Sequence, residues 1–536
     1  MINLMKEQTS NLSGHSPWNE NKLVIGIILV GIFLRVYHFL DNRSLWGDEI
    51  MLALNIVDYN YWQLALPLRM EQYAPLGFLW IEKSMNLMLG DGERALRLFP
   101  LFCGIVSLIL FYKLSKHILN KTERVIALTL LAFAHPAIYY SVEVKQYQTE
   151  MMVAILLYLS YYQYFNKINF NSMLTWGLLG ALALWFSYSA VFILASFSIV
   201  LLLEKFIKKN YPDIFVTAIA CSIWALSFLI NYFLFIKRGS SSNYLISYWA
   251  NNFFPVQLNI TWYFKTILHL FDNPLGINLQ LPLVYDKLFR FSVFGFLLLI
   301  VGIVYFIKQQ NKHIALLIPA LLIAVVSAFQ KYPIFERFLL FYSPILFILI
   351  AKGAGRIQYI LENKQYKYVY SILLLLLLLP TVSNSIYQLL NRDFFGLNKR
   401  RESKEVFAYI NTKSQASDSV YIHWKLEIPL EYYDKLNNYK FVPVYGTDVN
   451  SFASDINSYT TLYTSDIEKL IGKDSVWLAV SSIKNVDENY FSPPRIVSEA
   501  AFLKDIADKY GVLIHQKKFL DTEVYLYNFS ATRKSK

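Results

Sequence analysis

Long apolar runs constrain this chain more than any other feature of its sequence. A helix needs about 20 mostly apolar residues to cross the hydrocarbon layer of a membrane. Runs of roughly that length recur between residues 23 and 388, and we expect about eleven spanning helices. Their predicted ranges are 23–40, 95–115, 124–140, 148–165, 172–187, 189–204, 213–236, 288–307, 313–330, 336–351 and 368–388. The sequence therefore predicts a polytopic α-helical membrane protein.

Composition and charge agree with this fold class. The chain is 55% hydrophobic with a mean hydropathy of +0.36, which is too apolar for a soluble protein of 536 residues. Residues 390–536 contain 20 Lys and Arg against 19 Asp and Glu, so the excess positive charge lies before residue 390. Basic residues in short loops between spans explain the net charge of +12, and we do not expect a nucleic-acid partner.

The basic loops also predict the orientation. If the spans alternate, one side of the membrane receives the loop residues Lys116, Lys121, Arg124, Lys205, Lys208, Lys209, Lys308, Lys312, Lys352, Arg356, Lys364 and Lys367. The positive-inside rule makes that side the cytoplasm. We therefore expect a plasma-membrane protein with a cytoplasmic N-terminus and no cleaved leader. The loop at 41–94, the turn near Glu143, segment 237–287 and the tail after 390 would lie outside.

The tail has a different pattern from the rest of the chain. Short runs of β-branched and aromatic residues at 420–424, 441–444, 476–480 and 524–527 predict strands. Helices are expected between them at 402–413, 428–437, 465–471 and 498–509. Residues 1–389 are thus predicted to form the transmembrane catalytic domain, and residues 390–536 a soluble extracytoplasmic α/β domain. Within the first outer loop, residues 75–90 predict an amphipathic surface helix.

Two adjacent carboxylates, Asp48 and Glu49, follow the first span closely. Acids near the hydrocarbon layer are costly unless they face water, a partner or a substrate. The simpler alternative is an acidic cap for a helix at 50–57. A partly desolvated carboxylate is a good proton acceptor near neutral pH, so both residues are candidate catalytic groups.

Two short outer turns carry the candidate binding residues. The first turn contains Glu143, Lys145 and Tyr147, and the second contains Arg337. Arg97 stands near the start of the second span. Arginine forks and lysine match phosphate groups, so several at one depth suggest a site for an anionic headgroup. The alternative for these turns is a membrane interface with snorkelling basic residues and belt tyrosines.

Several other chemistries lack their motifs. The sequence contains no Walker loop, no Rossmann glycine fingerprint, no H-E-x-x-H and no G-x-S-x-G. Cys103 and Cys221 lie inside apolar runs, which excludes a disulfide framework and a cysteine metal site. No cofactor is predicted with certainty. A divalent cation bound through oxygens of Asp48 with Glu49 or Glu143 is left open.

The order of these motifs resembles the GT-C superfamily of membrane glycosyltransferases. The motifs are Leu45-Trp46-Gly47-Asp48-Glu49, Tyr73-Ala74-Pro75-Leu76, Gly92-Glu93-Arg94-Ala95-Leu96-Arg97, the His135-Pro136 to Tyr147 stretch and Pro333 to Arg337. The resemblance covers about residues 23–390 and is strongest to the protein O-mannosyltransferase and aminoarabinose-transferase-like family, as a bacterial member. One departure is Tyr73-Ala74, where relatives often have histidine or a lysine and a proline.

The resemblance implies the reaction and the roles of the residues. Such enzymes use a sugar linked to a polyprenyl phosphate, with a catalytic carboxylate in the first outer loop. By position, Asp48 is the implied catalytic carboxylate with Glu49 beside it. The implied headgroup site comprises Glu143, Lys145, Tyr147, Arg97 and Arg337. The implied function is inverting transfer of a sugar to a glycolipid, an envelope polysaccharide or a protein on the outer face.

Two other functions share these sequence features. A transporter or flippase of lipid-linked saccharides would also have many spans and basic outer turns, but ionisable residues deep within helices would be expected. A non-enzymatic assembly subunit would use the tail as its binding module. Convergence of the carboxylates and basic residues on one outer cavity would favour the transferase.

Overall fold

The computed structural model describes residues 20–277, 292–309, 312–362, 367–395, 398–453, 455–482 and 498–530. The start of the span expected at 288–307 and the loop residue Lys364 lie outside these ranges. The chain divides into two compact units. The first comprises residues up to 39, 73–78 and 99–389, and the second comprises 40–72, 79–98 and the chain from 390.

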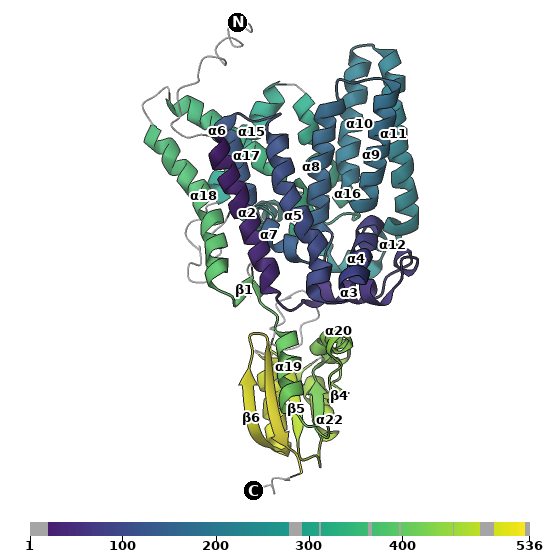
Figure 1. Cartoon of the computed structure of the whole chain (residues 1–536), viewed down its shortest axis with the longest axis vertical. Coiled ribbons are helices and arrows are strands. Elements are labelled where there is room, and N and C mark those ends of the chain that lie inside the picture. The colour runs from purple at the N-terminus through teal and green to yellow at the C-terminus, as the bar shows by residue number, and fades with distance from the viewer. Residues whose placement is uncertain are drawn as a thin grey trace. The chain divides into compact units, whose positions relative to one another are not determined.

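The first unit is helical (Figure 1). Its helices, some of which begin or end in the second unit, are α2 (Glu20–Asp41), α5 (Glu93–Ser115), α6 (Lys121–Phe133), α7 (His135–Tyr139), α8 (Tyr147–Tyr164), α9 (Phe170–Phe186), α10 (Ala190–Ile207), α11 (Tyr211–Asn231), α12 (Lys237–Ser240), α13 (Asn243–Tyr248), α14 (Ile260–Asp272), α15 (Ser292–Gln309), α16 (Ile318–Ala328), α17 (Ser343–Glu362) and α18 (Lys367–Leu390). Each of the predicted spans corresponds to helix in the described residues, so the polytopic fold class is confirmed.

The number of spanning helices is not confirmed. Six helices of the described residues are long and apolar enough to cross a membrane, or seven if a bent pair counts as one span. The bent pair is α6 with the helical turns at 135–142, which diverge by 54°. Pro136 stands in the first turn of α7 and has no backbone N–H to donate to Ala132, four residues earlier, so the hydrogen bonding of α6 does not continue through it. Three further apolar helices, at 170–186, 292–308 and 313–328, are shorter.

Glycines allow two of these helices to pack closely. An added Cβ at Gly302 of α15 would collide with the backbone of Leu349 in α17. An added Cβ at Gly353 of α17 would likewise collide with the backbone of Leu298 in α15. Small residues that bring helix backbones together are a common means of helix association in membranes. The reciprocal pair of glycines therefore fixes α15 against α17.

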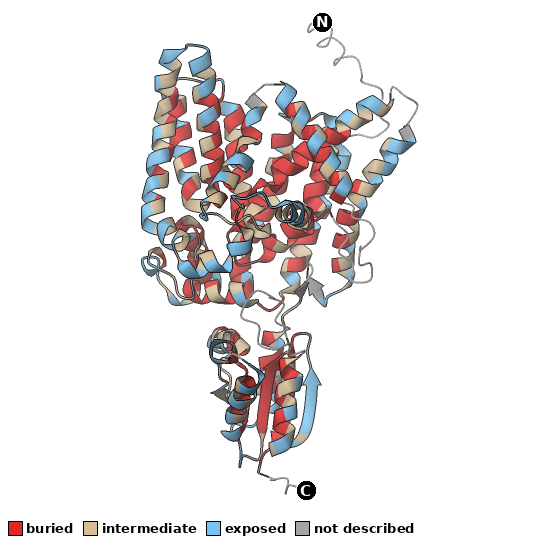
Figure 2. Cartoon of the chain, turned by 180° about the vertical axis from the view of Figure 1, so that it is seen from behind, coloured by how far each residue is buried: buried red, intermediate tan, exposed pale blue. Residues whose placement is uncertain are grey.

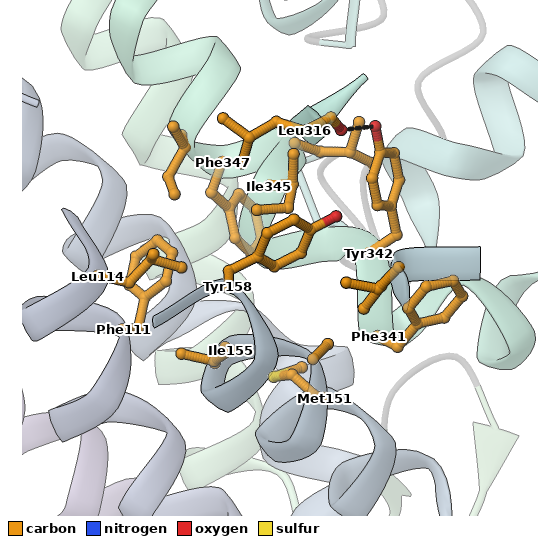
Figure 3. Close-up of a cluster of buried hydrophobic side chains, with 14 of the residues drawn as sticks. Phe111, Leu114, Met151, Ile155, Tyr158, Leu316, Phe341, Tyr342, Ile345 and Phe347 are labelled. Atoms are coloured by element: carbon orange, nitrogen blue, oxygen red, sulfur yellow. Dashed lines mark hydrogen bonds between the residues drawn. The ribbon is translucent and has the colours of Figure 1, made fainter. Parts of the chain in front are cut away.

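A buried aromatic and aliphatic cluster forms the core of this unit (Figure 3). It includes Phe111, Leu114, Tyr158, Tyr342 and Phe347, which come from α5, α8, the turn before α17 and α17 itself. The Tyr342 hydroxyl donates to the Leu316 carbonyl oxygen at 2.7 Å, so the buried polar group is paired. Away from this core, α11 exposes apolar side chains along its length, as expected of a helix that faces lipid (Figure 2).

The tail in the second unit folds as an α/β domain. Its five-stranded sheet has the order β4 (Val442–Tyr445), β3 (Ser419–Ile422), β5 (Val476–Ser481), β7 (Thr522–Asn528) and β6 (Val512–Lys518). Strand β3 is parallel to β4 and β5, whereas β7 is antiparallel to β5 and β6. All residues of the central strand β5 are buried (Figure 2). A separate two-stranded pair, β1 (Phe394–Phe395) with β2 (Asn398–Lys399), precedes the domain.

Five helices accompany the sheet: α19 (Ser403–Lys413), α20 (Glu427–Asn437), α21 (Val449–Phe452), α22 (Ile456–Glu468) and α23 (Glu499–Tyr510). All four predicted strands are present, and so are the helices expected at 402–413, 428–437 and 498–509. The helix expected at 465–471 instead covers residues 456–468, and β6 was not predicted. The soluble α/β character of the tail is confirmed.

The outer-loop segments of the second unit contain α3 (Gly47–Asp58) and the greater part of α4 (Leu76–Leu89). Helix α4 matches the amphipathic helix expected at 75–90. Phe78 and Leu79 are buried, whereas Trp80 and Leu87 are exposed. Helix α3 begins earlier than the expected range of 50–57 and includes Asp48 and Glu49 in its first turn.

Asp521, in the β6–β7 hairpin, gives the tail a predicted pH dependence. Burial raises the pKa of Asp521 to about 6, although Arg401 and the Glu402 backbone N–H oppose this. The pKa of an unfolded aspartate is about 3.9. The folded state thus holds the proton more tightly, and this stabilisation is complete below the unfolded pKa and lost as pH rises through the folded pKa.

We therefore expect the stability of the full-length protein to fall by about 2–3 kcal/mol between about pH 4 and pH 6 from this group alone. Asp521→Asn should flatten that slope, because the side chain no longer ionises. Thermal unfolding at about pH 5 and pH 7.5 measures the effect. An unchanged slope in Asp521→Asn would contradict the assignment.

Candidate active site

The first group of candidate residues lies where α3 begins. Gly47 and Asp48 are the first two residues of the helix, and Asp48 is half-buried. A Cβ added to Gly47 would meet no atom within 4 Å, so the helix start is open on that side. The free N–H groups of a first turn favour negative charge nearby. Asp48 is therefore a half-buried carboxylate in the first turn of α3, where the helix N-terminus favours its negative charge.

Glu49, the adjacent acid, is fully buried between two arginines. Arg97 donates to both of its oxygens at 2.9–3.1 Å, and Arg43 Nη1 lies 2.7 Å from Oε2. The backbone N–H of Trp46 donates to the same carboxylate at 3.3 Å. Arg97 also donates to the Arg43 carbonyl oxygen at 2.6 Å. We call Arg43, Glu49 and Arg97 the buried ion cluster.

The buried ion cluster makes Glu49 inaccessible to substrate, unlike the half-buried Asp48 beside it. Both Glu49 oxygens accept bonds from arginines and the side chain has no exposed surface, so it is closed to substrate. The cluster ties the start of α3 to the start of α5. A cation bound by Asp48 and Glu49 together would have to displace these arginine contacts. Among the described residues, no group of three His, Cys, Asp or Glu side chains could hold a metal ion.

The second group of candidate residues lies in the first unit. Glu143 and Lys145 form a tight turn, in which the Lys145 backbone N–H donates to the Glu143 carbonyl oxygen at 2.7 Å. Both side chains are buried, as is Tyr147 at the start of α8. The turn therefore belongs to the packed interior of its unit. It is not a membrane-interface turn with a snorkelling lysine and belt tyrosines.

Arg337 joins this turn through aromatic rings. Its guanidinium carbon lies 5.8 Å from the centre of the Tyr147 ring, 5.5 Å from that of Trp249 and 5.7 Å from that of Phe338. Planar guanidinium groups stack favourably on aromatic faces and still present donors at their edges. We call Tyr147, Trp249, Arg337 and Phe338 the arginine–aromatic cluster.

The structure thus brings the predicted residues together in two groups. Asp48, Glu49 and Arg97 form one group in the second unit, and Glu143, Lys145, Tyr147 and Arg337 form the other in the first. Sequence reasoning missed Arg43 and Trp249. Arg43 stands two residues before the Leu45–Glu49 motif, and nothing marked its charge as a partner of Glu49. Trp249 lies in the long segment 237–287, where no motif was recognised.

A comparison with known families finds a match to part of the chain. Residues 73–230 match the family model of dolichyl-phosphate-mannose-protein mannosyltransferases. This stretch contains Arg97, Glu143, Lys145 and Tyr147, whereas Asp48, Glu49 and Arg337 lie outside it. No curated protein sequence matches the chain.

Solved structures resemble the chain over nearly its whole length. ArnT from Cupriavidus metallidurans bound to undecaprenyl phosphate is 11% identical, with a TM-score of 0.51 over 94% of this chain and 97% of that protein. The Archaeoglobus fulgidus oligosaccharyltransferase in complex with Zn and sulfate is 12% identical, with a TM-score of 0.52 over 95% of this chain and 73% of that protein. The chain has the GT-C fold.

The GT-C fold confirms the family resemblance inferred from the motifs. It also confirms that the chain is an integral membrane protein with a soluble α/β region after its helices. The roles of the individual residues rest on the local geometry described above.

Proposed function

We propose that this chain is an inverting glycosyltransferase that moves a sugar from a polyprenyl-phosphate donor to an acceptor on the outer face of the plasma membrane. Its GT-C fold and its match to the mannosyltransferase family model support glycosyl transfer from a lipid-linked donor. One observation carries the assignment of the catalytic group. Of the two acids at the start of α3, Glu49 is fully buried against two arginines, whereas Asp48 is half-buried and keeps some exposed surface.

Asp48 acts as the general base in this proposal. Its carboxylate accepts the proton of an acceptor hydroxyl while the hydroxyl oxygen attacks the anomeric carbon. The bond from that carbon to the phosphate oxygen breaks on the opposite face, so the configuration inverts and polyprenyl phosphate leaves. No nucleotide takes part, which agrees with the missing nucleotide motifs. A positioned general base typically contributes about 10²–10⁴-fold to the rate.

The arginine–aromatic cluster and Lys145 stabilise the charge on the leaving phosphate. Arg337 is partly exposed and its guanidinium plane is held by rings, so its edge donors are preorganised for an anionic oxygen. Arg97 has a different role from the one expected by resemblance. Its donors are directed to Glu49 and to the Arg43 carbonyl, so it orders the loop beside Asp48.

The chemical outcome in cells tests this function. A strain lacking the protein should lose one sugar from a glycolipid, an envelope polysaccharide or a protein. Expression of the full-length protein in that strain should restore the sugar. Mass spectrometry of the envelope glycans detects the loss. A flippase would instead leave its lipid-linked saccharide accumulated and chemically intact. An assembly subunit would leave transfer by purified membranes undiminished when its own chain is removed. Either result would contradict the transferase.

Arg337→Ala should weaken binding of polyprenyl phosphate by about tenfold or more, because a hydrogen bond to a charged group contributes about 1.5–3 kcal/mol. Native mass spectrometry or a radioligand assay with undecaprenyl phosphate measures the affinity. Arg356→Ala is a matched control, since Arg356 of α17 also stacks on a tyrosine, with 4.9 Å between its guanidinium carbon and the Tyr359 ring centre. Equal losses in the two variants would exclude a specific phosphate contact.

A further inference from the structure

The α/β domain forms hydrogen bonds with residues 42–45, the loop that precedes Asp48. Within the second unit, the Tyr433 hydroxyl of α20 accepts the backbone N–H of Leu45 at 2.8 Å. The same hydroxyl donates to Glu93 Oε1 at 3.2 Å. Tyr433 and Leu45 are both fully buried. One hydroxyl from the tail thus joins the residue before the N-cap of α3 to the first turn of α5.

Helix α19 makes a second set of contacts with the same loop. The Lys404 ammonium donates to Glu93 at 3.0 Å and to the Asn42 carbonyl oxygen at 2.9 Å. The Ser44 hydroxyl donates to Glu405 at 2.7 Å and accepts the Lys404 backbone N–H at 3.1 Å. These contacts hold the backbone of residues 42–45, which leads directly into the catalytic turn.

Helix α20 also holds the far end of α3. The Lys435 ammonium lies 2.6 and 2.7 Å from the two oxygens of Asp58, the last residue of α3. Both ends of the helix that begins with Gly47-Asp48 are therefore bound by the tail. Burial raises the pKa of the Tyr433 hydroxyl well above its ordinary value, so it remains a donor to Glu93 at every physiological pH.

From these contacts we infer that the α/β domain positions Asp48, with Tyr433 and Lys404 as positioning residues that act through the backbone of residues 42–45. This inference rests on the proposed function, and it gives the tail a task in the reaction. Residues 43–45 are buried, and the tail supplies hydrogen bonds to this buried segment immediately before Asp48. A catalytic group misplaced by about 1 Å can lose about 10²-fold in rate.

Tyr433→Phe tests the inference, because it removes one oxygen and keeps the ring. We expect kcat to fall about tenfold or more while KM for the lipid donor stays within about twofold. Hydrogen exchange, followed by mass spectrometry, should accelerate in the peptide covering residues 43–58. Tyr409→Phe is the matched control, since its hydroxyl lies 2.7 Å from His515 Nε2 within the same domain. It should change neither readout.

A second variant tests the inference without the tyrosine. Lys435→Met should lower kcat and accelerate exchange in the same peptide, because α3 loses its ion pair with α20 while the pair of Asp58 with Arg69 at 2.6 Å remains. Unchanged kcat or unchanged exchange in Tyr433→Phe would overturn the inference, and so would unchanged exchange in Lys435→Met. Hydrogen exchange does not require turnover. If the proposed transfer reaction is wrong, the exchange measurement still tests whether the tail orders residues 43–58.

Discussion

Asp48→Asn should reduce sugar transfer by about 10²–10⁴-fold, the contribution of a general base. Asparagine keeps the size of the side chain and a carbonyl oxygen, but it does not accept the proton of the acceptor hydroxyl. The side chain is half-buried in the first turn of α3, and the substitution leaves the contacts of Glu49 with Arg43 and Arg97 in place. The protein should therefore fold, insert and bind polyprenyl phosphate normally. The loss of transfer activity should appear entirely as a lower kcat.

Steady-state transfer by purified protein in liposomes measures this effect, with donor binding measured separately. Asp474→Asn is the matched control, because Asp474 is an exposed aspartate of the α/β domain. It should retain full activity. An Asp48→Asn protein with normal kcat would show that another group accepts the proton. A loss confined to donor affinity would move Asp48 from catalysis to binding.

Periodicity predicted much of the fold because burial leaves a direct imprint on sequence. The apolar runs located the membrane helices, and the short run of apolar residues that begins Val476-Trp477 located the buried central strand β5. Strand β6 escaped prediction because Val512–Lys518 is largely exposed and ends in His, Gln and two Lys. Its place in the sheet comes from the ladder of hydrogen bonds to β7, which a polar sequence does not reveal.

The candidate site was predictable as a set of residues but not as a geometry. The sequence gives Asp48 and Glu49 as equivalent neighbours, yet consecutive residues of a helix point about 100° apart. The structure is needed to show that Glu49 is buried against Arg97 and that Asp48 stays half-exposed. The contact between Tyr433 and Leu45 joins residues 388 positions apart, and no local pattern marks either partner.

Glu49→Gln should destabilise the protein by about 3–5 kcal/mol, the usual cost of removing one partner from a buried ion pair. The substitution leaves the guanidinium groups of Arg43 and Arg97 buried without a counter-charge. It also turns an amide N–H₂ toward their donors. The apparent melting temperature of the full-length protein in detergent measures the loss. The outer-loop segments should become susceptible to proteolysis first, because the cluster joins α3 to α5.

Two comparisons separate this effect from a general loss of negative charge. Glu204→Gln in α10 removes the half-buried partner of the exposed Lys208, with 2.6 Å between Nζ and Oε1, and should cost about 1 kcal/mol because the lysine stays solvated. The double variant Glu49→Gln with Arg97→Gln should recover part of the stability, since it removes one uncompensated charge. If Glu49→Gln kept full stability and lost only turnover, Glu49 would share the catalytic role with Asp48. The opposite pattern in two adjacent acids, turnover lost at 48 and stability lost at 49, follows from the full burial of Glu49 against two arginines and the partial exposure of Asp48.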